Sequence, residues 1–409
     1  MHPSKEIVGI AGDMLKGRKV ALCVTGSVAA FLSPAIAREL MRHGAEVHVF
    51  MTHSAATLIS PTLMHWASGN PVVTEMTAEL EHVKYARDCD LVLVAPATAN
   101  TIAKVAAGVA DNAVTALILT AMGYQKKVVV VPAMHEPMWD AGQTRRNIEA
   151  LKRFGIQVIE PNVVEQKAKL SDISYIAGHV IRLLHPRRLP DGVRVLVAAG
   201  ATVEYIDPIR VVTNQSSGKM GLEIAFEAFR RGADVTLLLG HASISPPNHI
   251  PVIRVNDSES LKQVVRSQLS EKPPSIYFST VAVADYKPAR RLEGKADTAY
   301  EHRLKIDLEA VDKILPMVKE LSPSTLVVAF KAEYGVNEEQ LVEKAERLLE
   351  YSDIVYATDV ARPEARFGSE TTSGVVVDRT GRIITVSNKR KSEVAAMLVD
   401  LAASMTAGG

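Results

Sequence analysis

Residues 200–221 carry the side chains of this chain that are best suited to holding an anionic ligand. The segment runs from an apolar stretch that is predicted to be a strand, Val193–Ala199, into a predicted amphipathic helix, Met220–Arg230. The residues that open this helix, Ser216-Ser217-Gly218-Lys219, bring two hydroxyl groups and an ammonium to the free N–H groups of its first turn. Because a helix N-terminus attracts anions, the segment predicts a binding site for a phosphorylated ligand at the carboxyl end of a parallel sheet.

Three other positions in the same segment offer chemistry beyond phosphate binding. Gly200 leaves the backbone bare for close approach by a ligand, Arg210 supplies a fixed cation, and Asn214 supplies a carboxamide. Their polar loop gives neither Arg210 nor Asn214 a packing role. We therefore favour a functional role for both side chains.

Strand–loop–helix units that could position such a site occur twice in the chain. Residues 41–49 (Met-Arg-His-Gly-Ala-Glu-Val-His-Val) are similar to residues 229–237 (Phe-Arg-Arg-Gly-Ala-Asp-Val-Thr-Leu), and each stretch is typical of a helix end, a glycine cap and a strand. The similarity indicates either a duplication or the common helix-to-strand pattern. In both cases it predicts an α/β chain with two Rossmann-like, doubly wound domains. The proline- and arginine-rich residues 182–192 predict the boundary, which gives domains at 1–186 and 187–409.

Apolar stretches bounded by turn residues predict the strands of both sheets. In the first domain they are Val20–Thr25, Glu46–Met51, Leu91–Ala95, Val128–Pro132 and Gln157–Ile159. In the second they are Val193–Ala198, Asp234–Leu239, Pro251–Val255, Ser275–Ser279, Leu326–Lys331, Ile354–Ala357 and a hairpin over Gly374–Val386. A final amphipathic helix is predicted over Ser392–Thr406.

Composition excludes several classes of protein. The chain has 409 residues, 47% of them hydrophobic, and a net charge of +1, so no overall field attracts nucleic acid or a membrane surface. No apolar run reaches the about 18 residues of a membrane span, and the N-terminus lacks a signal-peptide core. The two cysteines, Cys23 and Cys89, are too few for a disulfide framework or a zinc cluster, which favours a reducing cytoplasm.

Polar groups also follow three strands of the first domain. A short turn at Thr25-Gly26-Ser27 could seat a mononucleotide phosphate, while Pro96–Thr101 and Pro132–His135 end two further strands. The first turn is not the Gly-x-Gly-x-x-Gly pattern, and no acidic residue ends the second strand, so a nicotinamide dehydrogenase is disfavoured. His82 lies in a predicted helix between these segments.

These motifs carry a resemblance to known families in both halves of the chain. Pro96-Ala97-Thr98-Ala99-Asn100-Thr101, Pro132-Ala133-Met134 and His82 together resemble the flavin-dependent cysteine decarboxylases. Asp207–Arg210, Asn214–Gly221 and Ala282–Tyr286 resemble the phosphopantothenate–cysteine ligase domain. In order and in length, from about residue 15 to about residue 400, the chain resembles the bifunctional coenzyme A biosynthesis family, and its pattern is similar to that of archaeal members.

The resemblance implies that the first domain is a flavodoxin-like flavoprotein that binds FMN. It implies that the cysteine-derived substrate is oxidised at its thiol-bearing carbon, loses its carboxylate and is then reduced again. His82 matches the catalytic histidine of the family, acting on a flavin held mainly by a neighbouring subunit. The positions that match the flavin site are Gly26, Ser27, Thr52, Ser54, Thr98 and Ala99, and those assigned to the substrate are Asn100, Met134 and His135.

Two departures from the family pattern affect the first domain. His135 stands where many members have an asparagine that holds the substrate carboxylate, and a histidine could donate the same hydrogen bond. The substrate flap at residues 164–170 has no cysteine, so the proton donor could be Lys167, Lys169, His135 or water. The alternative is a working ligase fused to a flavoprotein domain with reduced or lost decarboxylase turnover.

For the second domain the resemblance implies ligation of L-cysteine to 4′-phosphopantothenate with CTP and Mg²⁺ (or Mn²⁺); ATP stays open, and the metal ligands are unknown. The matching residues are Asn214, Arg210 and Lys295 for catalysis, Ala282 and Lys219 for the substrate, and Asp285, Lys295, Phe330 and Lys344 for the nucleotide. Trimeric flavin domains joined through dimeric ligase domains would give a homo-oligomer, and by family analogy a dodecamer.

Overall fold

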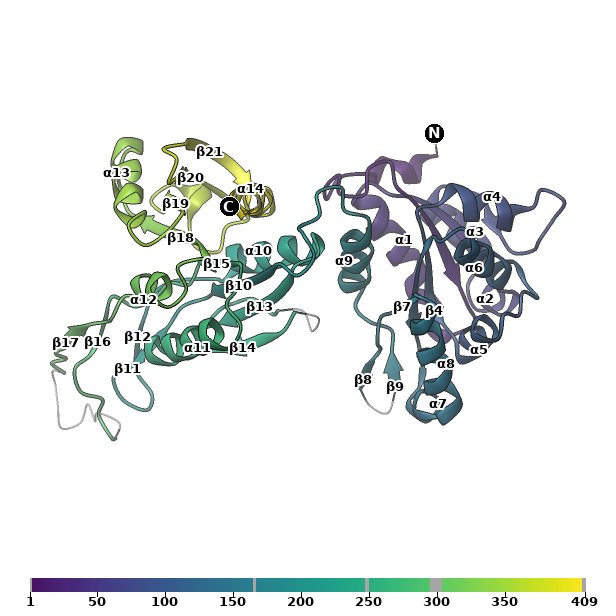
Figure 1. The fold of residues 1–409 in the computed structure, drawn as a ribbon, viewed down its shortest axis with the longest axis horizontal. Coiled ribbons are helices and arrows are strands. Elements are labelled where there is room, and N and C mark those ends of the chain that lie inside the picture. The colour runs from purple at the N-terminus through teal and green to yellow at the C-terminus, as the bar shows by residue number, and fades with distance from the viewer. Residues whose placement is uncertain (1, 165–166, 247–249, 295–303, 407–409) are drawn as a thin grey trace. The chain divides into compact units, whose positions relative to one another are not determined.

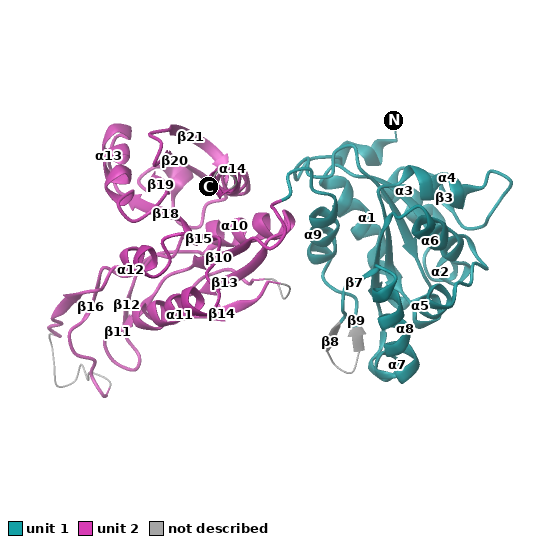
Figure 2. Cartoon of the chain, in the orientation of Figure 1, with its two compact units in different colours: residues 1–188 teal, residues 189–409 magenta. Residues whose placement is uncertain are grey.

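The computed structural model describes residues 2–164, 167–246, 250–294 and 304–406. The chain divides into two compact units, residues 1–188 and residues 189–409, which are coloured separately in Figure 2. Each unit has its own sheet and its own hydrophobic core, so each is described by itself.

Unit 1 is built on six parallel strands in the order β3-β2-β1-β4-β5-β7. The strands of this sheet are β1 (Lys19–Val24), β2 (Glu46–Met51), β3 (Val72–Val73), β4 (Leu91–Ala97), β5 (Lys127–Pro132) and β7 (Gln157–Val158). The helices are η1 (Pro3–Ile7), η2 (Val28–Leu32), α1 (Ser33–Arg42), α2 (His53–Leu58), α3 (Pro61–Ser68), α4 (Glu81–Asp88), α5 (Ala99–Ala107), α6 (Ala113–Gly123), α7 (Glu136–Asp140), α8 (Gly142–Arg153) and α9 (Ile173–Leu184). A small antiparallel sheet in the order β6-β9-β8 adds β6 (Met134–His135), β8 (Asn162–Val164) and β9 (Lys167–Lys169).

Apolar side chains of unit 1 are buried on both faces of this sheet. Along β1, Val20, Leu22 and Val24 pack with α1, α3 and α9, whereas Ala21 and Cys23 pack with α5, α6 and α8. This alternation is the two-residue period of a strand, and burial on both faces is why the strand is apolar throughout. Figure 1 shows the helices on the two sides of the sheet.

Unit 2 has an eight-stranded sheet in the order β14-β13-β10-β15-β18-β19-β20-β21. The first six strands in this order are parallel, and β20 and β21 continue the sheet as an antiparallel hairpin. Its strands are β10 (Arg194–Ala199), β13 (Asp234–Leu239), β14 (Val252–Arg254), β15 (Ile276–Ser279), β18 (Leu326–Glu333), β19 (Ile354–Asp359), β20 (Thr371–Asp378) and β21 (Ile383–Arg390). The helices are α10 (Lys219–Arg230), α11 (Ser258–Glu271), α12 (Ile314–Leu321), α13 (Glu338–Leu348), η3 (Pro363–Ala365) and α14 (Lys391–Thr406).

Two short antiparallel hairpins extend unit 2 beyond its sheet. They are β11 (Val203–Tyr205) with β12 (Val211–Thr213), and β16 (Tyr286–Pro288) with β17 (Leu308–Ala310). Figure 1 shows both hairpins at the same end of the unit, and β11 contacts β16.

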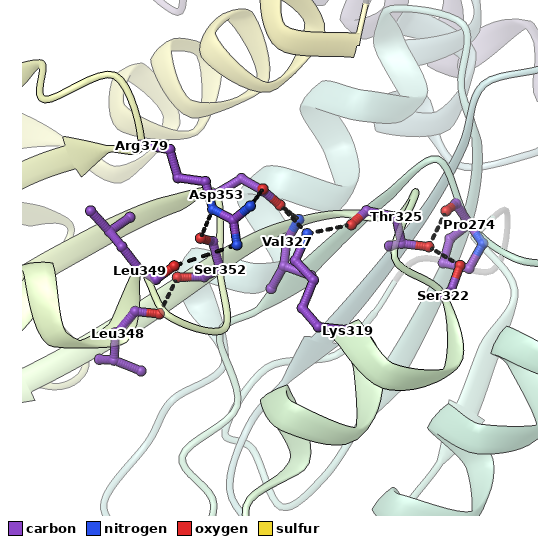
Figure 3. Close-up of polar contacts among 10 residues, drawn as sticks. All are labelled: Pro274, Lys319, Ser322, Thr325, Val327, Leu348, Leu349, Ser352, Asp353 and Arg379. Atoms are coloured by element: carbon purple, nitrogen blue, oxygen red, sulfur yellow. Dashed lines mark hydrogen bonds and ion pairs between the residues drawn. The ribbon is translucent and has the colours of Figure 1, made fainter. Parts of the chain in front are cut away.

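Asp353 anchors the amino-terminal ends of the central strands of unit 2. Its carboxylate accepts hydrogen bonds from Lys319 Nζ at 2.6 Å and from the Val327 N–H at 2.7 Å, and Arg379 lies 3.2 Å away (Figure 3). Arg379 also donates to the carbonyl of Ser352 at 2.8 Å. The cluster therefore joins α12, β18, β19 and the turn of the β20–β21 hairpin, at the opposite ends of β18 and β19 from the site described below.

The α/β class and the two doubly wound sheets predicted from the sequence are confirmed. Each predicted strand is present, and Asp234–Leu239 has the predicted bounds. The predicted hairpin is longer, Thr371–Arg390, and the last helix begins one residue earlier, at Lys391. The sequence did not predict the short antiparallel pairs, because two- and three-residue strands leave too little alternation to detect.

Candidate active sites

The residues assigned to the flavin site lie in three loops, and in the first turns of the helices that follow two of them, at the carboxyl edge of the unit 1 sheet. Gly26 and Ser27 follow β1, Thr52 and Ser54 follow β2, and Thr98 begins the loop after β4. β1 and β4 are neighbours in the sheet, but the chain continues from β1 to β2 on one side and from β4 to β5 on the other. Doubly wound sheets bind ligands at such a switch point.

Hydrogen bonds tie these loops to one another. The buried Thr25 hydroxyl donates to the carbonyl of Pro96 at 2.8 Å and accepts the N–H of Thr98 at 3.0 Å. Ser27 Oγ donates to the carbonyl of Ala133 at 3.1 Å, which adds the loop after β5. Thr98 also caps α5, whose first residues are Ala99 and Asn100, through the N–H of Thr101. These hydrogen bonds therefore hold the loops after β1, β4 and β5, which carry several of the predicted flavin residues, against one another.

Gly26 allows a close approach that no other residue would allow. A Cβ atom at this position would lie 2.6 Å from Cβ of Ser54. Glycine therefore lets the loop after β1 pack against the first turn of α2, leaving bare backbone at the edge of the sheet. Thr52 caps the same helix by accepting the N–H of Ala55 at 3.2 Å.

His82 lies in the first turn of α4, at the helix end away from the start of β4. Its Nδ1 atom is buried and has no hydrogen-bond partner among the described residues. A buried imidazole nitrogen without a hydrogen-bond partner costs free energy, which sets His82 apart from an ordinary surface histidine.

Met134 and His135 form β6, which pairs with one strand of the β8–β9 hairpin. The register places His135 opposite Lys167 and Met134 opposite Ala168. The flap region predicted at residues 164–170 thus lies beside the predicted substrate residues at the level of the backbone. Residues 165 and 166 lie outside the described residues.

Neither cysteine of unit 1 lies near this flap in the sequence or is suited to acid–base chemistry. Cys23 is in β1 and Cys89 follows α4, and both are buried. Burial raises the pKa of Cys89 to about 12 and raises that of Cys23 further. Both thiols therefore stay protonated and inert at neutral pH.

In unit 2, Asn214 and the residues that open α10 stand at the carboxyl edge of the sheet. Asn214 Nδ2 donates to the carbonyl of Val283 at 2.9 Å, which links the loop before α10 to the segment after β15. Gly221, in the first turn of α10, permits close packing, because a Cβ there would lie 2.5 Å from both Ala199 Cβ and Thr280 Oγ1. The helix N-terminus is therefore held directly against β10 and β15.

A cavity of about 1110 Å³ opens beside this helix N-terminus. Its lining includes six residues that the sequence predicted from separate segments: Asn214, Lys219, Ala282, Asp285, Phe330 and Lys344. They come from the loop before α10, α10 itself, the segment after β15, β18 and α13. The fold therefore brings most of the predicted ligase residues to one cavity.

Arg210 is not brought to this cavity. Arg210 closes the turn between β11 and β12, where its Nη1 donates to the buried carboxylate of Asp207 at 2.7 Å. The same carboxylate accepts the N–H groups of Ile209 and Arg210, both at 2.7 Å. Arg210 is not among the residues that line the cavity, and Lys295 lies outside the described residues.

The predicted nucleotide residues have partners along the cavity wall. Asp285 pairs with Lys313 at 2.6 Å, and Lys344 donates to Glu333 at 2.6 Å. Partial burial alone would raise the pKa of Glu333, but the hydrogen bonds from Lys344 and Lys331 hold it below its usual value.

The apolar part of the wall is built around two aromatic rings. Phe330 packs edge-on against Tyr356, with ring centroids 5.7 Å apart. Tyr356 shares a hydrogen bond of 2.9 Å with Thr372, and burial raises its pKa to about 12. Phe330 is thus partly a core residue and partly a cavity residue.

Sequence reasoning missed several cavity residues, among them Lys313, Tyr356, Arg366, Phe367, Thr372 and Lys391. They lie on β19, β20, α14 and connecting loops, and no motif or spacing relates them to residues 200–221. The start of α14 offered one signal, since Lys391 is a cation at a helix N-terminus, where a cation is unfavourable unless it has another role.

Among the described residues, no helix combines the length and the hydropathy of a membrane span. No group of three or more His, Cys, Asp or Glu side chains in the described ranges is placed to hold a metal ion.

Two family models match the chain, one in each unit. Residues 9–185 match the Flavoprotein family, and residues 191–405 match the DNA/pantothenate metabolism flavoprotein C-terminal domain.

Similar proteins extend over both units. The coenzyme A biosynthesis bifunctional protein CoaBC of Thermococcus kodakarensis is 44% identical over 93% of this chain and 93% of its own length. That of Escherichia coli K12 is 31% identical over 87% of this chain and 89% of its own. Among solved structures, the C-terminal domain of a CoaBC protein is 28% identical, with a TM-score of 0.44 over 54% of this chain and 98% of that one. By the two family models and the relatives that are similar over both units, the chain belongs to the CoaBC family of bifunctional coenzyme A biosynthesis proteins, which unite phosphopantothenoylcysteine decarboxylase with phosphopantothenate–cysteine ligase.

Proposed function

We propose that unit 2 ligates L-cysteine to 4′-phosphopantothenate with CTP through an acyl-cytidylate. The substrate carboxylate attacks the α-phosphate and pyrophosphate leaves; the cysteine amine then attacks the acyl carbon and CMP leaves. The observation that supports this most strongly is the single cavity that collects Asn214, Lys219, Ala282, Asp285, Phe330 and Lys344.

Asn214 and Lys219 are proposed to act on the acyl and phosphate groups. The Asn214 carboxamide keeps one N–H and its oxygen beyond the bond to Val283, and these are suited to orienting a carboxylate or an acyl-phosphate oxygen. Lys219 brings an ammonium to the same wall. Arg210 and Lys295 keep their proposed catalytic roles. For Arg210 this role requires that the β11–β12 turn approach a ligase cavity, either that of the same chain or that of a second subunit.

Asp285, Phe330 and Lys344 are proposed to hold CTP, with Phe330 against the base and Lys344 near the phosphates. We also propose that Mg²⁺ or Mn²⁺ accompanies the nucleotide, because a divalent ion that bridges phosphate oxygens neutralises the charge that develops in transfer at phosphorus. Asp285 is the carboxylate among the proposed nucleotide residues. Comparing product formation with CTP and with ATP, each with and without the metal, tests both choices.

We propose that unit 1 binds FMN and decarboxylates 4′-phosphopantothenoylcysteine to 4′-phosphopantetheine. Bound FMN would supply the two-electron chemistry that makes loss of the carboxylate possible. The described residues fit such a group, because Gly26 exposes backbone at the switch point and the loops of Ser27, Thr52 and Thr98 converge there. Ser54 and Ala99 complete the proposed flavin residues.

His82 is proposed to move the proton at the reacting carbon of the substrate, consistent with its buried Nδ1 that lacks a partner among the described residues. Asn100, Met134 and His135 are proposed to hold the substrate, with His135 donating to its carboxylate. The pairing of β6 with β9 supports the β8–β9 hairpin as the flap over the substrate. Which of Lys167, Lys169, His135 or water donates the final proton is the part that mutation must decide.

The proposed assembly is a homo-oligomer with trimeric flavin units and dimeric ligase units, which together permit a dodecamer. Large apolar side chains support it in both units. Val28 and Phe31 beside Gly26 are 79% and 64% exposed, and Ile209 and Tyr286 on the two hairpins are 65% and 58% exposed. Light scattering on the intact chain tests the stoichiometry.

A working ligase fused to an inactive flavoprotein domain is not favoured, since relatives named as bifunctional are similar to the chain across both units. We place the protein in the cytoplasm as a proposal supported by its two buried, unlinked thiols. The decisive test supplies 4′-phosphopantothenate, cysteine, CTP and Mg²⁺ to the flavin-loaded protein and identifies the products.

A further inference from the structure

Two lysines from different helices meet one loop at the corner of the unit 2 cavity. Lys219 is the first residue of α10 and Lys391 is the first residue of α14. Lys219 Nζ donates to the carbonyl of Gly368 at 2.8 Å and pairs with the carboxylate of Glu370. Lys391 Nζ donates to the carbonyl of Ser369 at 2.6 Å. Both lysines line the cavity.

The two ammonium groups are close enough to affect each other. Burial lowers the pKa of Lys391, and the cation of Lys219 lowers it further. Two carboxylates face them. Glu370 has a side chain that is 84% exposed, and Glu223 of α10 is mostly buried, which raises its pKa. Arg366, which precedes Gly368 in the same loop, also lines the cavity.

We propose that Lys391 and Lys219 form a phosphate subsite of the ligase cavity, in which the carboxylate of Glu370 takes the place of the phosphate when no ligand is bound. This inference rests on the proposed ligase function of unit 2 and adds Lys391 to its binding residues. The ligand class is a phosphomonoester or a pyrophosphate group, which either the nucleotide or 4′-phosphopantothenate could supply.

A phosphate group can replace the hydrogen-bond partners that Lys219 and Lys391 have in this structure. An exposed ion pair such as Lys219–Glu370 contributes little, because water screens it and both side chains lose freedom. A phosphate carries more charge than a carboxylate and has three terminal oxygens, so it can accept from both ammonium groups at once. Ligand binding then exchanges the carboxylate of Glu370 and the two carbonyls of the loop for phosphate oxygens.

The test uses the intact chain and pyrophosphate as the probe, titrated by calorimetry without nucleotide. Lys391→Gln should weaken pyrophosphate binding about tenfold through the loss of one charge-assisted hydrogen bond. Lys391→Arg should keep most of the affinity. Glu370→Gln should strengthen binding roughly threefold by removing the internal competitor. The matched control is Lys389→Gln. Lys389 lies two residues before Lys391 and forms an exposed ion pair with Glu393, and it does not line the cavity.

Steady-state ligation then identifies the source of the phosphate. A rise in the KM for CTP in Lys391→Gln assigns the subsite to the nucleotide, and a rise in the KM for 4′-phosphopantothenate assigns it to the acid substrate; in either case kcat should stay within about threefold.

Three results would overturn the subsite: equal pyrophosphate affinity in wild type, Lys391→Gln and Lys389→Gln, no pyrophosphate binding by wild type, or no gain in Glu370→Gln. Failure of the ligase proposal gives a different result. The wild-type protein would then form no amide, while its binding of pyrophosphate would still depend on Lys391.

Discussion

The side-chain amide of Asn214 donates a hydrogen bond of 2.9 Å to the main-chain carbonyl of Val283, which lies 69 residues later in the chain. This contact joins the loop that opens α10 to the segment that ends β15, and both segments line the same cavity. Asn214 therefore holds two walls of the proposed ligase site together.

Asn214→Asp should abolish ligation and spare decarboxylation. The substitution replaces a donor with a carboxylate that would face the Val283 carbonyl and repel the anionic substrates. We expect ligation to fall about 10²-fold or more, as for the loss of a group that stabilises developing charge. Each activity is measured separately, with 4′-phosphopantothenoylcysteine supplied for the second. Equal loss of both activities would contradict a two-site enzyme.

His82→Asn should have the opposite effect. A carboxamide can hydrogen bond, but it does not exchange a proton near neutral pH, so decarboxylation should fall about 10²- to 10⁴-fold while FMN and ligation are kept. The control is His65→Asn on α3, whose ring bonds to the carbonyl of Asn70 and has no proposed catalytic role. If both variants decarboxylate equally well, His82 is not the proton-transfer group.

Neither cysteine should be needed for decarboxylation. Since burial raises the pKa of both thiols, the native protein should resist alkylation at pH 7 to 8. A Cys23→Ala/Cys89→Ala double variant should retain turnover, at a cost of about 1 kcal/mol of stability for each buried sulfur removed. Mass spectrometry after alkylation and a turnover assay check the two parts. A double variant that binds FMN but does not turn over would assign an acid role to a buried thiol.

Gly26→Ala should impair flavin binding. The new Cβ would stand 2.6 Å from Ser54 Cβ, so the loop after β1 and the start of α2 must separate. Overpacking of this kind costs about 1 to 3 kcal/mol and moves the backbone that is proposed to face FMN. Flavin absorbance per protein chain reports the loss. Gly123→Ala, at the end of α6 with no atom within 4 Å of its Cβ, should keep its flavin.

The sequence predicted the sheets well because their signals are local. β1 and β10 are continuous apolar stretches followed by glycine-containing loops, and Asp234–Leu239 follows a glycine cap that marks where its helix ends. The strand Val193–Ala199 also placed the loop of Asn214 at the carboxyl edge of a sheet, whereas Ala282 and Phe330 were assigned to the same site by the family resemblance.

What the sequence could not predict depends on contacts between distant segments. The β6–β9 pairing, which puts His135 opposite Lys167, involves strands too short to show a period. Lys391 comes 172 positions after Lys219, and only the fold places the first turns of α10 and α14 against one loop. The position of Arg210 was also not predictable, because its bond to Asp207 depends on the geometry of the β11–β12 turn.

One measurement tests the central claim most directly: product analysis of the flavin-loaded chain given 4′-phosphopantothenate, L-cysteine, CTP and Mg²⁺. A bifunctional enzyme forms 4′-phosphopantetheine, with one CO₂ and one pyrophosphate released per molecule. Accumulation of 4′-phosphopantothenoylcysteine without CO₂ would contradict decarboxylation by unit 1, and absence of any amide product would contradict ligation by unit 2.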